Sequence, residues 1–243
     1  MTSHPELELI ELCAGYGDVQ IVRDFSTRLQ PASITTLIGG NGAGKSTLLR
    51  AIFGTSRWFS GQIIFHGEAI EHLSPSERLL RGIGFVPQGR CNFPQMSVAE
   101  NLKMGCYTLP GRRHRTAIAR ATEQFPLLTR KWSEMAGNLS GGEQQVLETA
   151  MVLLSGPKLL LLDEPSLGLS PKMQAEVFAV AKQIAAAGVT VLVVEQNVHG
   201  ALLVSDTAIV MELGRKFLEG PAAEVRNDPR IRDAYLGGNI KEH

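Results

Sequence analysis

Residues 39–47 have the residue types and the spacing of a phosphate-binding loop (P-loop). The run reads Gly-Gly-Asn-Gly-Ala-Gly-Lys-Ser-Thr and fits the pattern G-x-x-x-x-G-K-[ST], directly after an apolar segment. Glycines let consecutive backbone N–H groups turn toward phosphate oxygens, and the following helix adds its positive N-terminal end. Lys45 would reach the β- and γ-phosphates of a nucleotide, and the Ser46 hydroxyl would hold Mg²⁺. The predicted phosphate-binding residues are Gly39, Asn41, Gly42, Ala43, Gly44, Lys45, Ser46 and Thr47.

Two adjacent carboxylates, Asp163 and Glu164, follow a run of four leucines. Ligands of a parallel sheet bind at the carboxyl ends of its strands, so both acids should face the nucleotide. Asp163 suits a place beside Mg²⁺, and Glu164 is placed to orient or deprotonate the attacking water. A buried strand that ends in a turn at Pro165 would explain this segment alone, but its combination with a P-loop favours nucleotide hydrolysis.

Residues 139–145, Leu-Ser-Gly-Gly-Glu-Gln-Gln, form a second predicted anion-binding helix start. Ser140 has the side chain of a helix N-cap, and Gly141 and Gly142 leave the backbone open to a ligand. Together with the P-loop and the strand that ends in two carboxylates, this signature segment resembles the ATP-binding cassette (ABC) family over almost the whole chain. The three motifs in this order are highly specific for that family.

The resemblance implies roles for residues at matching positions. Tyr16 matches the aromatic residue that stacks on adenine, and Gln88 matches a glutamine that contacts Mg²⁺ or the attacking water. Gln196 stands where many members carry a histidine, and its amide can donate a hydrogen bond to the γ-phosphate without titrating. The nearby His199 is expected at the surface or at a helix cap. The implied catalytic residues are Glu164, Gln88, Gln196 and Lys45, and the implied Mg²⁺ residues are Ser46, Gln88 and Asp163.

The resemblance also implies a head-to-tail dimer that uses ATP and Mg²⁺. Ser140, Gly141 and Gly142 match residues that contact the γ-phosphate held by the opposite subunit, so one chain would supply parts of two sites. The implied partners are a second ABC ATPase, identical or different, and membrane-spanning permease subunits. A periplasmic or extracellular substrate-binding protein would act on the chain indirectly. The implied location is the cytoplasmic face of the cell membrane, through the permease.

Departures from the commonest motif pattern narrow the resemblance. Glu143 replaces the last glutamine of the signature, Ser170 replaces a loop aspartate, and Gly40 replaces a frequent proline of the P-loop. The segments 142–145, 163–169 and 194–197, the last of which contains Gln196, are together similar to the ATPase subunits of bacterial importers for branched-chain amino acids, related hydrophobic amino acids, amides or urea. The tail at residues 232–238 is similar to the same group.

Other functions within the family are the alternatives. The ATPase of a lipopolysaccharide exporter is also a lone cassette with a similar tail, and Gln196 and the loop 165–169 favour the importers over it. An ATPase of DNA maintenance would carry long coiled coils between P-loop and signature, whereas Lys45 and the signature serine are only 95 residues apart here. Intact Lys45, Asp163 and Glu164 disfavour a structural or binding role without turnover.

These motifs require strands and helices that alternate along the chain. Apolar or β-branched runs predict strands at residues 34–38, 83–86, 159–162 and 189–194, and helical composition predicts helices at 45–53, 142–154 and 171–187. The alternation predicts an α/β fold, a P-loop NTPase core with a mainly parallel sheet. Leu7, Leu9, Ile64 and Phe65 indicate an additional N-terminal antiparallel β layer.

We expect one ABC nucleotide-binding domain over the whole chain. Strand signals vanish after Cys91, and prolines and glycines interrupt short helical stretches there. The predicted parts are an α/β core at 1–90 and 140–225, a helical insertion subdomain at 91–139, and a C-terminal tail at 226–243. The basic run at residues 111–115 is predicted to be a solvated turn.

Composition limits the remaining possibilities. The chain has 243 residues with 44% hydrophobic and 20% charged content, as packed globular proteins do. Lys plus Arg and Asp plus Glu both number 24, so no net charge favours nucleic acid as a partner. Three cysteines without C-x-x-C spacing indicate free thiols and no zinc site. We expect no signal peptide, and the apolar stretch 184–194 is shorter than the roughly 20 residues of a membrane span.

Overall fold

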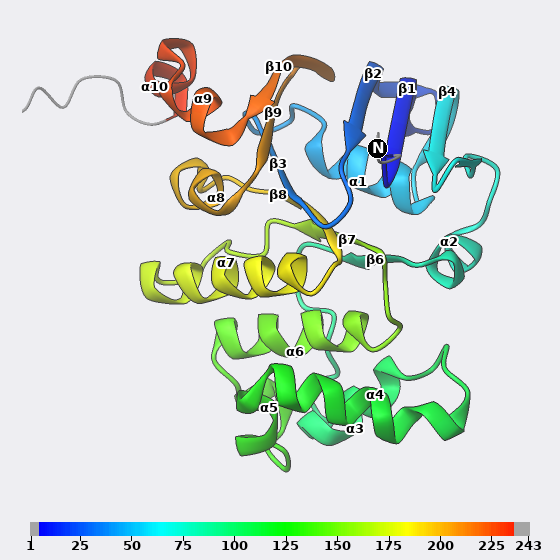
Figure 1. The fold of residues 1–243 in the computed structure, drawn as a ribbon, viewed down its shortest axis with the longest axis vertical. Helices are drawn as coiled ribbons and strands as arrows, with labels where there is room; N and C mark the ends of the chain where they lie inside the picture. The colour runs from blue at the N-terminus through cyan, green and yellow to red at the C-terminus, as the bar shows by residue number, and fades with distance from the viewer. Residues whose placement is uncertain (1–4, 236–243) are drawn as a thin grey trace, which may run out of the picture.

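A six-stranded sheet forms the centre of the computed structural model, which describes residues 5–235 (Figure 1). Its strand order is β10-β9-β3-β8-β7-β6, and within it only β9 and β10 pair antiparallel. This sheet confirms the predicted α/β fold and the four predicted strands to within one residue. The strands are β3 (Ile34–Ile38), β6 (Ile83–Val86), β7 (Leu159–Asp163), β8 (Thr190–Val194), β9 (Thr207–Glu212) and β10 (Arg215–Pro221).

Helices on both faces explain why β3, β7 and β8 are buried at every position. Leu159 and Leu161 of β7 pack into the core around α1 (Lys45–Phe53), whereas Leu160 and Leu162 pack against α7 (Pro171–Ala186) on the other face. Burial of each leucine side chain contributes about 1.5–3 kcal/mol. These two helices lie within one residue of the predicted ranges and fix the loops at the strand ends from both sides.

An antiparallel sheet of order β2-β1-β4-β5 forms a second layer beside α1 (Figure 1). Leu7 pairs with Phe65, and Leu9 pairs with Ile63. The N-terminal antiparallel layer predicted from Leu7, Leu9, Ile64 and Phe65 is therefore confirmed. Leu48 and Leu49 of α1 share one core with both sheets, so the helix that follows the P-loop lies at their junction. The strands are β1 (Leu7–Tyr16), β2 (Val19–Leu29), β4 (Arg57–Phe65) and β5 (Glu68–Ala69).

Helices fill the segment between β6 and the signature, as predicted. They form a third layer that packs against α6 (Gly141–Leu153), and α6 in turn packs against α7 and against β6 of the central sheet (Figure 1). Val98 and Leu102 share a buried cluster with Leu147 of α6, so the signature helix is attached to the insertion. The insertion contains α3 (Val98–Gly105), α4 (Gly111–Gln124), α5 (Pro126–Arg130) and the 3₁₀ turn η1 (Ala136–Asn138).

The prediction of a solvated turn at residues 111–115 is wrong about the conformation. These residues form the first turn of α4, whose N-cap position is Pro110. Proline fixes φ near the helical value, so the helix begins directly after it, although Gly111 and three arginines gave a loop-like composition. Arg112, Arg113 and Arg115 are exposed, as the prediction requires.

Four short helices complete the described chain. They are α2 (Pro75–Arg81), α8 (Val198–Val204), α9 (Ala222–Asn227) and α10 (Pro229–Tyr235), so the first half of the predicted C-terminal tail is helical. Residues 236–238 of the tail similarity lie outside the described residues. Within residues 5–235, no helix combines the length and the apolar character that crossing a membrane requires.

Candidate functional site: a nucleotide site at the ends of three parallel strands

The P-loop connects β3 to α1 and encloses a cavity of about 200 Å³. Gly42 and Gly44 have φ angles of 79° and 102°, which glycine adopts without strain. A Cβ atom on Gly44 would also lie 3.0 Å from the Met211 side chain. The cavity is lined by Asn41, Gly42, Ala43, Gly44, Lys45, Ser46, Thr47, Glu164 and by Ile21, which the sequence did not indicate.

Lys45 is buried and folds back over the loop. Its Nζ atom donates hydrogen bonds to the carbonyl oxygens of Gly39 at 2.8 Å and Gly40 at 3.1 Å. Burial lowers the pKa of Lys45, and the neighbouring carboxylates of Glu164 and Asp163 oppose that shift. The geometry places a cation at the cavity wall, where phosphate oxygens can replace the two carbonyl partners.

Ser46 and Asp163 form the second polar pair at the cavity. The Ser46 hydroxyl donates to Oδ1 of Asp163 at 2.8 Å, and the buried Oδ2 of Asp163 has no hydrogen-bond partner among the described residues. Burial raises the pKa of Asp163, and the Ser46 hydrogen bond opposes this. An unpartnered carboxylate oxygen beside a hydroxyl fits Mg²⁺, which takes one or two protein oxygens and completes its shell with water and phosphate.

Gln88, Glu164 and Gln196 meet at the ends of three neighbouring strands. They follow β6, β7 and β8, which are adjacent and parallel in the sheet. Gln88 Nε2 donates to Oε2 of Glu164 at 2.9 Å, and Gln196 Nε2 donates to Oε1 at 2.9 Å and Oε2 at 3.0 Å. The Glu164 backbone has φ 51°, a conformation that costs a non-glycine residue energy and often occurs at functional sites. Two amides from distant segments thus orient one carboxylate beside the P-loop cavity.

The signature residues start α6 away from the P-loop cavity. Ser140 is the N-cap, and its side chain and that of Glu143 form a capping box. A Cβ atom on Gly142 would lie 2.6 Å from the Met173 side chain, so glycine allows the close packing of α6 on α7. Ser140, Gly141 and Gly142 do not line the P-loop cavity, but Gly141 borders a separate cavity of about 530 Å³ with Gln88 and Glu164.

Tyr16 and His199 lie at the edges of this region. The Tyr16 hydroxyl accepts a hydrogen bond from Arg50 of α1 at 3.1 Å, and the residue is exposed and is not part of the cavity wall. His199 is exposed, and the N-cap of α8 is Asn197, whose Oδ1 accepts from Gly200 N at 3.1 Å. His199 is therefore a surface residue, and Gln196 is the residue of this loop that reaches Glu164.

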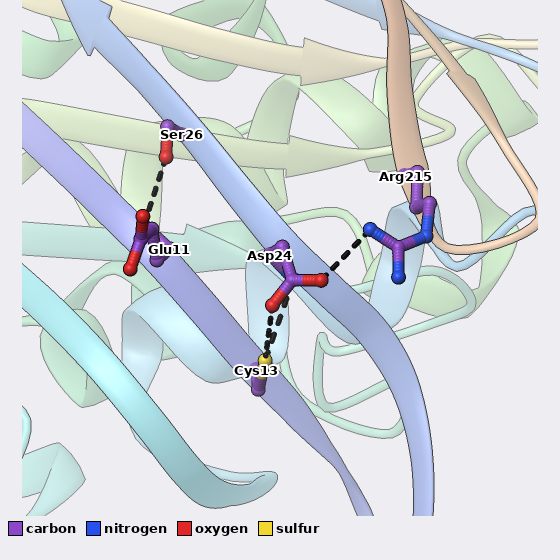
Figure 2. A network of polar contacts seen from close by, with 5 residues as sticks. All are labelled: Glu11, Cys13, Asp24, Ser26 and Arg215. Atoms are coloured by element: carbon purple, nitrogen blue, oxygen red, sulfur yellow. Dashed lines mark hydrogen bonds and ion pairs between the residues drawn. The ribbon is translucent and has the colours of Figure 1, made fainter.

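The turn between β9 and β10 supports the P-loop, which the sequence did not indicate. Gly214 donates to Ala43 O at 2.9 Å and accepts from Arg23 N at 2.8 Å, and a Cβ atom on it would lie 1.9 Å from Ile21 O. Figure 2 shows the adjacent side chains, in which Arg215 pairs with Asp24 at 2.8 Å. The antiparallel layer is thereby fixed to the turn that contacts the loop.

A buried carboxylate also holds the loop after Glu164. Glu195 accepts hydrogen bonds from the backbone N–H of Ser166 at 2.9 Å and from its hydroxyl at 2.8 Å. Burial raises the pKa of Glu195, and the bonds from Ser166 oppose the shift. In the sequence, the only indication of this contact was that an acidic residue, Glu195, stands between a buried strand and Gln196.

Comparisons with known proteins agree with this geometry. A family model described as ABC transporter matches residues 22–167. The high-affinity branched-chain amino acid transport ATP-binding protein BraG of Pseudomonas aeruginosa is 43% identical over 92% of this chain and 96% of BraG. The lipopolysaccharide export system ATP-binding protein LptB of Acidithiobacillus ferridurans is 31% identical over 97% of this chain and 98% of LptB. A crystal structure of the ADP conformation of an ATP-binding cassette of an ABC transporter superposes with a TM-score of 0.85 at 26% identity and covers 97% of this chain and 100% of that chain. The chain therefore belongs to the ABC transporter family, as an ATP-binding subunit that hydrolyses ATP.

Proposed function

We propose that this chain powers the import of branched-chain amino acids or of related solutes, namely other hydrophobic amino acids, amides or urea. The catalytic part of this proposal rests on the Glu164 carboxylate, which Gln88 and Gln196 hold beside the P-loop cavity. The solute class is supported by the similarity to BraG, whose identity to this chain is higher than that of LptB.

Glu164 is the proposed group that orients the attacking water and accepts its proton. Its two oxygens are fixed by three hydrogen bonds from amide donors, and about one carboxylate lone pair, on Oε1, remains for a water molecule. Lys45 is proposed to exchange its carbonyl partners for β- and γ-phosphate oxygens and to stabilise charge there. Tyr16 remains the proposed adenine contact, because its side chain is exposed beside α1.

Ser46 and Asp163 are the proposed Mg²⁺ residues. Asp163 Oδ2 is the buried oxygen that lacks a partner in the described chain, and it supports this assignment. When bound, Mg²⁺ neutralises charge on the phosphate oxygens. Gln88 remains a proposed contact to Mg²⁺ or to the attacking water through its amide oxygen, because its amide nitrogen donates to Glu164.

We also propose a head-to-tail dimer with an identical or a different ABC ATPase. Each chain holds a P-loop cavity and, apart from it, a signature helix start with open backbone N–H groups. Ser140, Gly141 and Gly142 would contact the γ-phosphate bound to the partner's P-loop. Two partial sites would then be completed only across the interface.

The proposed contact with the permease, at the cytoplasmic face of the membrane, is the loop after Gln88. Phe93 and Met96 are 41% and 36% exposed, and Pro94 is exposed between them. Asn101 holds this loop, since its Oδ1 accepts from Phe93 N at 2.7 Å and its Nδ2 donates to Phe93 O and Met96 O. The loop thus presents apolar side chains on an ordered backbone, as docking surfaces do.

Single cysteines at positions 93 and 96 are expected to cross-link to co-expressed permease subunits. The exposed native Cys91 would first be replaced by serine, and a cysteine at the exposed Leu80 of α2 serves as the control position. Cross-links from 93 and 96 but not from 80, resolved by electrophoresis of purified complexes, support the docking surface. Their absence in an assembled complex would contradict it.

Gln196→Ala is expected to reduce ATP turnover by about tenfold, the cost of one hydrogen bond to a charged group. Gln196→His should introduce a pH dependence between about pH 6 and 7.5 that the wild type lacks at this position. ATPase assays from pH 5.5 to 8.5 measure both effects. The control is His199→Ala, which should stay near wild type because His199 is exposed. Loss of turnover in His199→Ala with normal Gln196→Ala would reverse the assignment.

Transport by the complete complex tests the proposed solute class. The chain would be purified with its permease, reconstituted in vesicles with its substrate-binding protein, and supplied with ATP. Labelled leucine, urea and lipopolysaccharide would be compared, with Glu164→Gln as the inactive control. ATP-dependent uptake of leucine or urea supports the proposal, whereas movement of lipopolysaccharide alone would favour the exporter function.

A further inference from the structure

A buried carboxylate outside the catalytic cluster holds the segment after Gln88. Glu148, in the middle of α6, is 3% exposed. Its Oε1 accepts from Cys91 N at 3.0 Å, Asn92 N at 3.3 Å and Asn92 Nδ2 at 2.6 Å, and its Oε2 accepts from the Cys91 thiol at 3.6 Å. Within residues 5–235 Glu148 forms no ion pair.

A buried carboxylate without a cation is expensive unless hydrogen bonds compensate for its lost hydration. Packing alone between α6 and the loop would need only an apolar side chain of similar size. All four donors to Glu148 come from two consecutive residues of one loop, Cys91 and Asn92. The carboxylate therefore fixes the position of that backbone relative to α6.

The fixed residues lie close to the catalytic glutamine. Gln88 precedes Cys91 by three residues and donates to Glu164. Between them, Gly89 has φ 98°, and a Cβ atom there would meet open space. The position of Gln88 thus depends on the β6 strand before it and on the Glu148 contact after it.

We propose that Glu148 is a positioning residue for ATP hydrolysis, which clamps Cys91 and Asn92 to the signature helix and so keeps Gln88 aligned on Glu164. The inference rests on the proposed roles of Gln88 and Glu164. Ser140 and Glu148 belong to the same helix, about 12 Å apart along its axis at 1.5 Å per residue. A displacement of α6 at the partner's nucleotide would therefore move the Gln88 segment with it.

Three substitutions of Glu148 test the clamp in the full chain. Glu148→Ala removes the acceptor, and Glu148→Asp keeps the charge but shortens the side chain by one methylene group. Both are expected to lower kcat for ATP by about 10- to 100-fold, the cost of misplacing a catalytic group by about 1 Å. The KM for ATP should change little, because the P-loop is untouched. Glu148→Gln retains an oxygen for the three N–H donors and should restore most of kcat.

The Cys91 thiol provides a second measurement that does not depend on ATPase activity. Cys91 is exposed as a whole residue, but its thiol lies against the Glu148 carboxylate. Desolvation of the thiol, with further contributions from the Glu148 charge and hydrogen bond, raises the pKa of Cys91 to about 12. Iodoacetamide labelling located by mass spectrometry should therefore be slow in the wild type at pH 8. It should be faster in Glu148→Ala and Glu148→Gln, because both remove the negative charge.

Thr149→Ala is the matched control, since Thr149 is the next residue of α6 and is also buried. The Thr149→Ala variant should keep the wild-type kcat and the slow wild-type labelling of Cys91, even if its melting temperature falls as far as that of Glu148→Ala. Folded Ala and Asp variants with wild-type kcat and wild-type labelling would overturn the inference. If Glu148→Ala does not fold, Glu148→Asp decides. If the wild type does not hydrolyse ATP but Glu148→Gln changes the labelling of Cys91, the proposed catalytic roles are rejected and the clamp is kept.

Discussion

Glu164→Gln is expected to reduce ATP turnover by about 10²- to 10⁴-fold while ATP binding persists. The substitution removes the proposed proton acceptor and keeps the shape of the side chain. Lys45, Ser46 and the loop glycines that line the cavity remain in place. The variant should therefore accumulate as an ATP-bound dimer, because in the proposed dimer binding closes the interface and hydrolysis no longer opens it.

Gel filtration with ATP and Mg²⁺, together with a phosphate-release assay, measures both parts of this expectation. Glu176→Gln is the matched control, because it makes the same chemical change on an exposed position of α7. The control should hydrolyse ATP at the wild-type rate and should not accumulate as a dimer. A Glu164→Gln protein that stays monomeric under all ATP conditions and still hydrolyses ATP would remove Glu164 from its role.

Mixing two inactive variants is expected to restore activity if the sites form head to tail. Lys45→Ala damages the P-loop half of a site, and Ser140→Asp places a carboxylate where the signature half would meet the partner's γ-phosphate. A heterodimer of the two contains one doubly damaged site and one intact site. Random association would give half heterodimers and thus roughly a quarter of wild-type activity if the sites work independently.

Aspartate is chosen at position 140 because it is as good a helix N-cap as serine, so α6 should keep its start. Ser74→Asp is the matched control, since Ser74 and Glu77 form the same capping box at the start of α2. That variant should be active by itself. If heterodimers of the two inactive chains form, as shown by differently tagged subunits, and remain inactive, the signature residues do not complete the partner's site.

The sequence by itself determined the local features of this protein. The strands β3 and β6 and the helix α1 were predicted at their observed bounds, because apolar runs and a glycine-rich turn act over a few neighbouring residues. The capping residue Ser140 was identified for the same reason, since its hydrogen bond partner lies three residues away. The P-loop, the two carboxylates and the signature were likewise contiguous motifs.

Only the tertiary structure decided which atoms of these features contact one another. Gln88, Glu164 and Gln196 are far apart in the chain, and the strand order β8-β7-β6 brings the three loops together. Hydrogen-bonding partners across such distances depend on which strands pair and which helix faces pack, and a run of apolar residues does not encode either. For the same reason the sequence did not predict the hydrogen bonds by which Glu148 clamps Cys91 and Asn92, since Glu148 is only one acidic residue within a predicted helix.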